Sequence, residues 1–347
     1  MRSSAPVFQQ LVLVGGGHAH ALVIRMWAMK PVPGVQLILV SPNWQTPYSG
    51  MLPGLLAGHY NTDDVHIDLR RLCNWAGVRF IEDKVVGIDR ETQRLTLQAR
   101  GQLEYDLLSL DIGSTPDSSL PGQEAHAETV KPIDRFYPRF LSLVERCLGS
   151  DKPLSIAVVG GGAGGVEVIL ALAHRLRSEG IEARLHLIVR DHGLLADYPP
   201  AVIAAAEMAL DAADITLHGH FDVAEVKETA LIPREGEQLA VDEVFFCTHA
   251  KAAAWVSDTG LDVDKGGFVR VNRHLQSLTD ANIFAAGDIA AMVETPRPKA
   301  GVYAVRQGPV LFENLRRRVM DQPLKSFRPQ SNFLSLLTLG EKRALAS

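Results

Sequence analysis

Two stretches of the chain join a short apolar run to a glycine-rich turn and then to a helix-forming run. In the first, residues 11–14 are Leu-Val-Leu-Val, residues 15–17 are all glycine, and residues 21–26 are mostly apolar. A short run of aliphatic and β-branched residues predicts a buried strand. A strand that passes into a helix through glycine presents bare main-chain amides at the positive end of the helix dipole, where a pyrophosphate can bind.

The same pattern returns at residues 156–167. Here Gly160, Gly162 and Gly165 complete the spacing of the dinucleotide fingerprint, whereas the first stretch has His20 in place of its third glycine. One such turn is a weak signal, but two on one chain indicate an internally duplicated architecture with two nucleotide sites. Two nucleotide cofactors suggest that electrons pass from one to the other.

The rest of the pattern predicts further α/β units. Runs with strand character lie at residues 35–40, 78–81, 84–89, 94–98, 105–113, 184–189, 241–249 and 281–288, and helical runs lie at 64–75, 133–148 and from 299 onward. Residues 333–347 predict a strand, a turn and half of a second strand, as if the chain stopped inside a hairpin. Residues 46–58 are rich in glycine and proline yet apolar, which fits either a rigid segment against a flat aromatic ring or a buried loop.

Composition excludes several classes of protein. The 347 residues exceed the roughly 250–300 that one core supports, so two domains are expected. The net charge of −5 gives no basic footprint for a nucleic acid. No run reaches the roughly 18 apolar residues that span a bilayer, and the N-terminal residues do not resemble a signal peptide. Three cysteines, odd in number and far apart, favour a reducing cytoplasm, and no set of residues has metal-ligand spacing.

The residues that follow the second strand of each unit bear on nucleotide recognition. In a dinucleotide fold, an acid at this place binds the adenosine ribose. The first unit has Ser41, which can bond a ribose without charge, and the second has Arg190. An arginine there can accept the 2′-phosphate of NADPH or stack on adenine, so the choice between NADH and NADPH stays open.

Two histidines border the first glycine turn. His18 can donate a bond to a pyrophosphate, or it can be a neutral ring packed behind the loop. His20 stands where a small residue is usual, and we expect it to be structural.

Residues 279–288, Thr-Asp-Ala-Asn-Ile-Phe-Ala-Ala-Gly-Asp, resemble the second FAD motif of the pyridine nucleotide–disulfide oxidoreductase superfamily, and residues 105–114 resemble its strand ending in a glycine turn. The resemblance implies an α/β fold of two Rossmann-like, three-layer ββα domains that bind FAD and NADH or NADPH. It implies that residues 1–114 and 268–330 form a discontinuous FAD-binding domain. Residues 115–267 would form an inserted NAD(P)H-binding domain, and residues 331–347 the start of a truncated C-terminal segment.

The resemblance also implies the residues of each site. Those expected at FAD are Gly15, Gly16, Gly17, His18, Ala19, Ser41, Pro47, Tyr48, Val85, Val86, Ile112, Gly113, Gly287, Asp288, Val302 and Tyr303. Those expected at NAD(P)H are Gly160, Gly162, Ala163, Gly164, Gly165, Glu167 and Arg190. Glu167 matches a glutamate that type II NADH dehydrogenases place near the nicotinamide, and it is the candidate catalytic residue, orienting the carboxamide or relaying a proton.

Within the superfamily, the chain is similar to the type II NADH dehydrogenase and sulfide:quinone reductase branch, because it lacks the Cys-x4-Cys pair of the disulfide reductases. Cys73, Cys147 and Cys247 do not match the reactive cysteines of sulfide:quinone reductases. Residues 15–20 together with residues 46–60 resemble more closely the flavoprotein region fused ahead of selenide, water dikinase. A fused dikinase domain is therefore a candidate partner, and oligomeric state is open.

The resemblance implies a dehydrogenase that passes a hydride from NAD(P)H to FAD and then electrons to a second, small-molecule acceptor. Hydride transfer needs the two rings to be held roughly 3–3.5 Å apart. The acceptor would enter near residues 46–52 and 303–307. Residues 301–308 depart from the quinone-site run of type II dehydrogenases at Val302 and Arg306, so the acceptor is open between a quinone and a selenium or sulfur species. The alternative is an FAD-binding redox-sensing or scaffold domain of the fusion with little turnover. The expected location is the cytoplasm, with peripheral membrane association left open.

Overall fold

A computed structural model describes residues 6–117, 119–190, 193–248, 250–330 and 334–347. The chain divides into two compact units. Unit 1 contains the described residues of 1–48, 66–115 and 251–331, and unit 2 contains those of 49–65, 116–250 and 332–347. The larger part of unit 2 is therefore inserted into unit 1.

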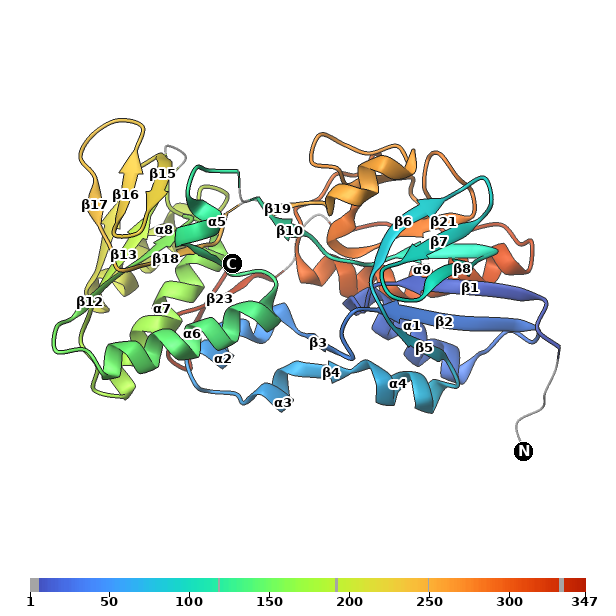
Figure 1. Ribbon diagram of the computed structural model, residues 1–347, viewed down its shortest axis with the longest axis horizontal. Helices are drawn as coiled ribbons and strands as arrows, with labels where there is room; N and C mark the ends of the chain where they lie inside the picture. The colour runs from blue at the N-terminus through green and yellow to red at the C-terminus, as the bar shows by residue number, and fades with distance from the viewer. Residues whose placement is uncertain (1–5, 118, 191–192, 249, 331–333) are drawn as a thin grey trace. The chain divides into compact units, whose positions relative to one another are not determined.

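Unit 1 is built on a five-stranded parallel sheet in the order β21-β9-β1-β2-β5. Its strands are β1 (Gln9–Val14), β2 (Val35–Ser41), β5 (Arg79–Glu82), β9 (Leu107–Leu110) and β21 (Ile283–Ala285). The helices are α1 (His18–Met29), α4 (Leu69–Ala76) and α9 (Gly301–Val319), and α1 packs against both α4 and α9 (Figure 1).

A second, antiparallel sheet of unit 1 consists of β6 (Val85–Asp89), β7 (Arg94–Leu97) and β8 (Gly101–Glu104). Ile88 and Leu95 from this sheet share one hydrophobic core with Val23 and Ile24 of α1, so unit 1 has three layers. Shorter elements of unit 1 are β3 (Gln45–Pro47) paired with β4 (His66–Asp68), η2 (Ala254–Thr259), η3 (Gly287–Ile289), and β20 (Val269–Val271) paired with β22 (Ala290–Met292).

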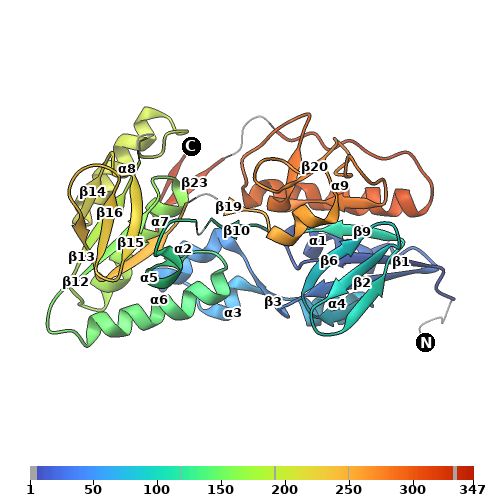
Figure 2. The ribbon, with the colours of Figure 1, turned by 45° about the horizontal axis from the view of Figure 1, so that its top comes forward.

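Unit 2 repeats the design with the parallel order β11-β18-β12-β13-β14, of which Figure 2 labels β12, β13 and β14. Its strands are β11 (Glu128–Thr129), β12 (Leu154–Val159), β13 (Ala183–Ile188), β14 (Ile215–His218) and β18 (Glu243–Phe246). The main helices are α6 (Ile133–Leu148), α7 (Ala163–Ser178) and α8 (Pro200–Ala212). The antiparallel sheet is β15 (Val223–Lys227), β16 (Ala230–Pro233) and β17 (Leu239–Ala240).

The five-stranded sheet of unit 2 separates two cores. Val158 of β12 packs with the three helices, while its neighbours Ala157 and Val159 pack with Val226 of β15 and Leu231 of β16. Side chains alternate between the faces of a strand, so helices cover one face and the antiparallel sheet covers the other. The predicted fold class, two Rossmann-like three-layer domains, is confirmed.

The two sheets differ in one respect that follows from the insertion. In unit 1 the edge strand β21 is the last of the five strands of its sheet in chain order, whereas β11, at the same place in unit 2, comes before β12, the strand that precedes the glycine turn. The short strands β10 (Thr115–Pro116) and β19 (Ala250–Lys251) pair where the chain enters and leaves the inserted part.

One local prediction needs correction. The helix predicted over residues 64–75 is broken into α3 (Thr62–Val65), β4 and α4, because the Asp68 side chain accepts a bond from the Arg71 amide, 2.7 Å away, and starts a new helix. Residues 334–347 contain a hairpin in which β23 (Leu336–Thr338) pairs with β24 (Ala344–Ala346). Phe333, the first residue of that prediction, lies outside the described residues.

The apolar segment after Tyr48 is helical. It forms η1 (Ser49–Met51) and α2 (Leu52–Leu56), and Leu52, Leu55 and Leu56 are buried in the core of unit 2. These side chains therefore match the buried-loop interpretation, in a helical form.

The bounds of the units differ from the expected domains. Residues 49–65 belong to unit 2 and residues 251–267 to unit 1, because leucines of α2 pack in the core with α7 and the η2 residue Val256 packs in the core of unit 1. A further α-helical turn, α5 (Gln123–His126), begins the inserted part. Among the described residues, no helix is both long and apolar enough to cross a membrane.

Gly165 brings α7 close to the turn before it, and the adjacent Gly164 provides a matched control. A Cβ on Gly165 would collide with the Gly160 carbonyl oxygen, whereas a Cβ on Gly164 would meet nothing within 4 Å. We expect Gly165→Ala to lower the free energy of unfolding by about 1–3 kcal/mol through overpacking, and Gly164→Ala to raise it by up to about 1 kcal/mol through helix propensity. Denaturant midpoints measure both; equal midpoints would contradict the close approach.

Candidate nucleotide-binding sites

The glycine turn of unit 1 is shaped by Asp111, which follows β9. Its carbonyl oxygen accepts a bond from the Gly17 amide at 3.1 Å. Gly15 has φ +92°, and a Cβ there would collide with the same carbonyl group. A Cβ on Gly17 or on Gly287 would collide with the Asp111 carboxyl group. One residue therefore excludes side chains at three glycines of the site.

Asp111 was not predicted as a site residue, although its neighbours Ile112 and Gly113 were. It is 3% exposed, and its carboxylate accepts a bond from the His20 amide at 3.1 Å and another from the Ala19 amide. The carboxylate thus sits at the N-terminal end of α1, whose N-cap Gly17 has no side chain to satisfy the first amides. Its hydrogen-bond partners are about ninety residues away in the chain, so no local pattern predicts these contacts. The only signal for Asp111 in the sequence is its position next to the predicted site residues Ile112 and Gly113.

His20 fastens the turn to the sheet. Its ring is fully buried, with Nδ1 2.8 Å from the Gly15 carbonyl oxygen and Nε2 2.8 Å from Ser109 Oγ. A carbonyl oxygen only accepts, so Nδ1 carries the proton and the Ser109 hydroxyl donates to Nε2. Burial lowers the pKa of His20 to about 4, opposed by the bond to Gly15, and the ring is neutral. The predicted structural role is supported by this geometry.

His18 has the features of a ligand-binding residue. Its Nε2 is buried and has no hydrogen-bond partner among the described residues. The ring lies against that of Tyr48, with 4.9 Å between centroids, and burial lowers the pKa of His18 while the nearby Asp288 carboxylate raises it. A buried polar atom without a partner costs free energy, which a bound phosphate or ribityl oxygen would recover. These residues fit FAD.

The turn at Gly287 and Asp288, in the run that resembles the second FAD motif, lies beside Asp111 and so beside the glycine turn of unit 1. Asp288 accepts a bond from the Ser114 hydroxyl at 3.1 Å, and the Gly287 amide donates to Gln307 Oε1 at 2.7 Å. Gln307 is 3% exposed, and this bond holds the turn to α9. Leu52, at the other end of the predicted acceptor region, is likewise buried in a core.

Lys299 is a further residue that the sequence did not single out. Its Nζ donates to the Ala290 carbonyl at 2.7 Å and lies 4.0 Å from the centroid of the Phe268 ring. Burial lowers the pKa of Lys299, while Asp264 and Asp288 raise it. Together with Asp288 and Tyr303 it lines a small cavity of about 20 Å³.

The other residues predicted at FAD lie in several elements of unit 1. Ser41 is buried, donates to the Asn43 carbonyl at 2.9 Å, and has its Oγ 3.3 Å from where a Cβ on Gly16 would lie. Pro47 is in β3, Gly113 has φ +68° with open space beside it, and Val302 and Tyr303 are in the first turn of α9. Val85 is buried in the core and Val86 is 38% exposed, so of these two Val86 is the one open to a ligand.

The glycine turn of unit 2 is more open. Gly160 has φ +137°, and a Cβ there would lie 2.8 Å from the Cys247 carbonyl oxygen. Gly162 and Gly164 are exposed, and a Cβ on either would meet nothing within 4 Å. Gly162 caps α7 without a side-chain bond, and Ala163 begins the helix. Bare amides beside unfilled space are what a nucleotide pyrophosphate requires.

Glu167, in the first turns of α7, is held by the C-terminal hairpin. Its Oε1 accepts bonds from the Thr338 amide at 2.9 Å and from the Thr338 hydroxyl at 3.0 Å. Burial raises the pKa of Glu167, and the two bonds from Thr338 lower it. The hairpin is fastened to the same unit by Tyr198, whose hydroxyl lies 2.9 Å from Ser335 Oγ, and by His59, whose Nε2 donates to the Gly340 carbonyl at 2.8 Å.

Arg190, which follows β13, is exposed, and the Gly193 amide donates to its carbonyl oxygen.

Burial raises the pKa of the thiols of Cys73 and Cys247 to about 12, and it raises the pKa of the Cys147 thiol as well. All three thiols are therefore protonated at neutral pH and are not reactive thiolates. In the part of the chain that is described, no three histidine, cysteine or acidic residues are grouped to hold a metal.

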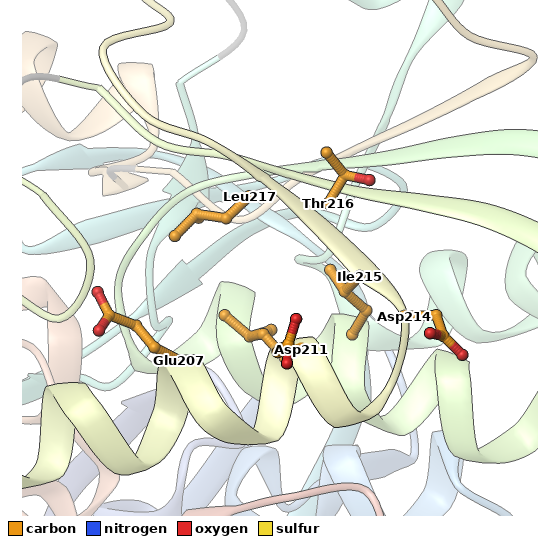
Figure 3. Close-up of a pocket in the computed structure, with 7 residues that line it drawn as sticks. Glu207, Asp211, Asp214, Ile215, Thr216 and Leu217 are labelled. Carbon is orange, nitrogen blue, oxygen red and sulfur yellow. The ribbon is translucent and has the colours of Figure 1, made fainter.

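A larger pocket of about 490 Å³ runs along α8 and β14. Figure 3 shows that its acidic side chains, Glu207, Asp211 and Asp214, come from α8 and from the turn before β14. An acidic rim repels phosphate, so this pocket does not compete with the glycine turn for a nucleotide.

The chain is similar to a known family, to named proteins and to solved structures. The model of the family described as pyridine nucleotide-disulphide oxidoreductase matches residues 9–308. Ferroptosis suppressor protein 1 of Taeniopygia guttata is 26% identical over 95% of this chain and 86% of that protein. Demethylphylloquinone reductase of Synechocystis is 26% identical over 80% and 71%. The structure of NDH2 from Plasmodium falciparum in complex with NADH superposes with a TM-score of 0.84 at 14% identity, covering 97% of this chain and 90% of that one.

The bonds of His20 generate a stability prediction. Replacing it in His20→Ala leaves the Gly15 carbonyl and the Ser109 hydroxyl buried without partners, and we expect a loss of about 2–4 kcal/mol in the free energy of unfolding. Because the folded pKa of His20 lies below the usual 6.5, its contribution is present above pH 6.5 and is lost as the pH falls toward 4.

The difference in stability between wild type and His20→Ala should therefore shrink between pH 6.5 and 4. Asp111 titrates in both proteins, so its contribution largely cancels in the difference. Denaturant unfolding at a series of pH values measures it, and a difference that stays constant with pH would contradict a neutral buried ring.

Thr338 generates a second prediction. Thr338→Val removes the hydroxyl bond to Glu167 and keeps the amide bond, while Thr338→Ser keeps both. With about 1 kcal/mol lost from the bond, we expect the Kd for NAD(P)H to rise about fivefold in Thr338→Val and to change little in Thr338→Ser. Titration of the folded variants measures this; equal constants would show that the hairpin does not position Glu167.

Proposed function

The chain belongs to the pyridine nucleotide-disulphide oxidoreductase family, and we propose that it passes electrons from NAD(P)H through FAD to a quinone. As a member of this family it is an FAD-dependent NAD(P)H dehydrogenase. The proposal adds the place of each nucleotide and the class of the acceptor.

FAD is assigned to unit 1. The observation that carries the assignment is the buried Nε2 of His18, which has no partner among the described residues and lies in the electrostatic range of Asp288. In this proposal the N-terminal end of α1 holds the pyrophosphate, Asp288 holds the ribityl side, and Tyr48 and Tyr303 border the ring system. The flavin, when bound, supplies the redox chemistry, and the protein supplies binding and orientation.

NAD(P)H is assigned to unit 2, on the exposed amides at Gly162 and Gly164. Glu167 is the proposed catalytic residue. Since Thr338 occupies its Oε1, its Oε2 is the oxygen left to orient the nicotinamide carboxamide or to hold a proton. Arg190, exposed after β13, is the residue proposed to face the adenosine half.

A quinone is favoured as acceptor by two observations. One relative is named demethylphylloquinone reductase. In addition, the three thiols are protonated by burial, whereas direct chemistry on a selenium or sulfur species would need a reactive thiolate. The dikinase fusion and the low-turnover scaffold stay predictions from the sequence.

The acceptor is tested by steady-state turnover with NADH or NADPH and one of three acceptors, a water-soluble benzoquinone, selenite or polysulfide. We expect the quinone to be reduced at least about tenfold faster than the others, with Cys73→Ser, Cys147→Ser and Cys247→Ser unaffected in acceptor turnover. Turnover that is faster with selenite or polysulfide, and that is lost in one cysteine variant, would contradict the proposal.

The nucleotide assignment is tested by Gly162→Val. The backbone at Gly162 has φ −80° and a Cβ there meets no atom, so the variant should fold, yet its side chain fills the space that a pyrophosphate needs. We expect flavin reduction by NAD(P)H to fall by about 100-fold or more while FAD stays bound. Gly219→Val, also in open space in unit 2, is the matched control and should behave as wild type. Loss of FAD from Gly162→Val would show that the two nucleotides are assigned to the wrong units.

A further inference from the structure

Asp111 places a carboxyl group inside the site that should hold the FAD pyrophosphate. Its Oδ2 accepts a hydrogen bond from the His20 amide at 3.1 Å, and its carbonyl oxygen accepts one from the Gly17 amide. Its carboxyl group occupies the space where a Cβ on Gly17 or on Gly287 would lie. It therefore touches the first glycine turn and the turn of the second FAD motif at once. Side chain and cofactor phosphate share the N-terminal end of one helix.

The Asp111 carboxylate and the FAD pyrophosphate would both be stabilised by the N-terminal end of the α1 dipole. A helix N-terminus carries roughly half a positive charge, and its effect is confined to the first turn. The carboxylate already uses the amides of Ala19 and His20. A pyrophosphate adds two further negative charges within this buried region, where like charges repel more strongly than in water.

No cation beside Asp111 relieves this repulsion in the described part of the chain. From α1, the His20 ring is neutral, and His18 faces Asp288. From η3, Asp288 adds a second negative charge. Lys299, before α9, interacts with Asp264 and Asp288 and donates to Ala290. The strands β1 and β9 carry no ionisable residue. Protonation of the Asp111 carboxyl group lowers the charge at the point where the carboxyl group and the pyrophosphate meet.

Taking FAD to bind unit 1 as proposed above, we propose that Asp111 is a proton-linked positioning residue, which takes up one proton from solvent when the FAD pyrophosphate binds at α1. Oδ2 keeps its bond from the His20 amide, and Oδ1, beside Gly287, carries the proton and can donate to a phosphate oxygen. FAD affinity then depends on pH through this one side chain.

Protonation of Asp111 is already easy in the protein without bound FAD. Burial raises the pKa of Asp111 to about 7; the bond from the His20 amide opposes the shift and Asp288 adds to it. Near neutral pH, little work is needed to protonate the group. Above that range the carboxylate is ionised in the free protein, and binding FAD must protonate it. Each further pH unit should then weaken FAD binding by up to about tenfold, the limit for one proton.

The test is binding of FAD to the full chain freed of its cofactor. The quench of flavin fluorescence gives Kd from pH 6 to 9, and calorimetry in buffers of different ionisation enthalpy gives the protons taken up. For wild type we expect Kd to rise about tenfold from pH 7.5 to 8.5 and uptake to approach one proton. Asp111→Asn keeps an oxygen to accept the amides and loses the titrating group, so its Kd should vary less than about twofold over that range, without uptake.

Asp106→Asn is the matched control, because Asp106 stands at the opposite end of β9 and its carboxylate also accepts a main-chain amide, that of Gln10 at 2.6 Å. It should retain the wild-type slope. If Asp111→Asn does not fold, proton uptake by His18→Gln decides the matter, because this variant removes the other titratable side chain at the turn: uptake that persists supports Asp111, and uptake that is lost overturns the inference. A flat Kd without uptake in wild type, or the same uptake in folded Asp111→Asn (as titration of His18 would give), would overturn the inference. Folded wild type that binds no FAD at any pH would instead overturn the proposed function.

Discussion

The structure depends on keeping side chains away from the main-chain amides that begin α1 and α7. In unit 1 the excluded space is filled by Asp111, which meets Gly15, Gly17 and Gly287. In unit 2 the Cys247 and Gly160 carbonyl groups play this part at Gly160 and Gly165. Helix, strand and turn can approach so closely only because no Cβ intervenes, and the same close approach leaves amides for a phosphate.

The two sites share this principle and differ in charge and access. The turn of unit 1 holds a buried acid, a neutral buried His20 and a His18 nitrogen with no partner among the described residues, which suits a cofactor that stays bound. The turn of unit 2 leaves Gly162 and Gly164 exposed, which suits a nucleotide that binds and dissociates in each turnover. Glu167 is set by a hairpin from the end of the described chain, so a distant segment controls the residue proposed to act on the nicotinamide.

Local patterns predicted the duplicated fold and both glycine turns, because strand, turn and helix are adjacent in the chain. Contacts between distant residues could not be predicted in this way. Asp111 meets His20 across 91 positions and Thr338 meets Glu167 across 171, and neither pairing leaves a periodic signal. The run from Val65 to Leu72 keeps a helical apolar spacing, yet Asp68 divides it by capping a second helix. The composition of residues 46–58 left open whether Leu55 and Leu56 lie against a ring system or in a buried segment, and the structure places them in the core of unit 2.

The central claim is that one chain holds two nucleotides in two amide-lined turns and passes electrons between them. Anaerobic titration of the FAD-loaded protein with NADH, and separately with NADPH, tests it most directly through the visible absorbance of the flavin. The account predicts that one equivalent of at least one nicotinamide bleaches one equivalent of flavin, and that added quinone restores the colour. Flavin that stays oxidised in the presence of an excess of both nicotinamides would contradict it.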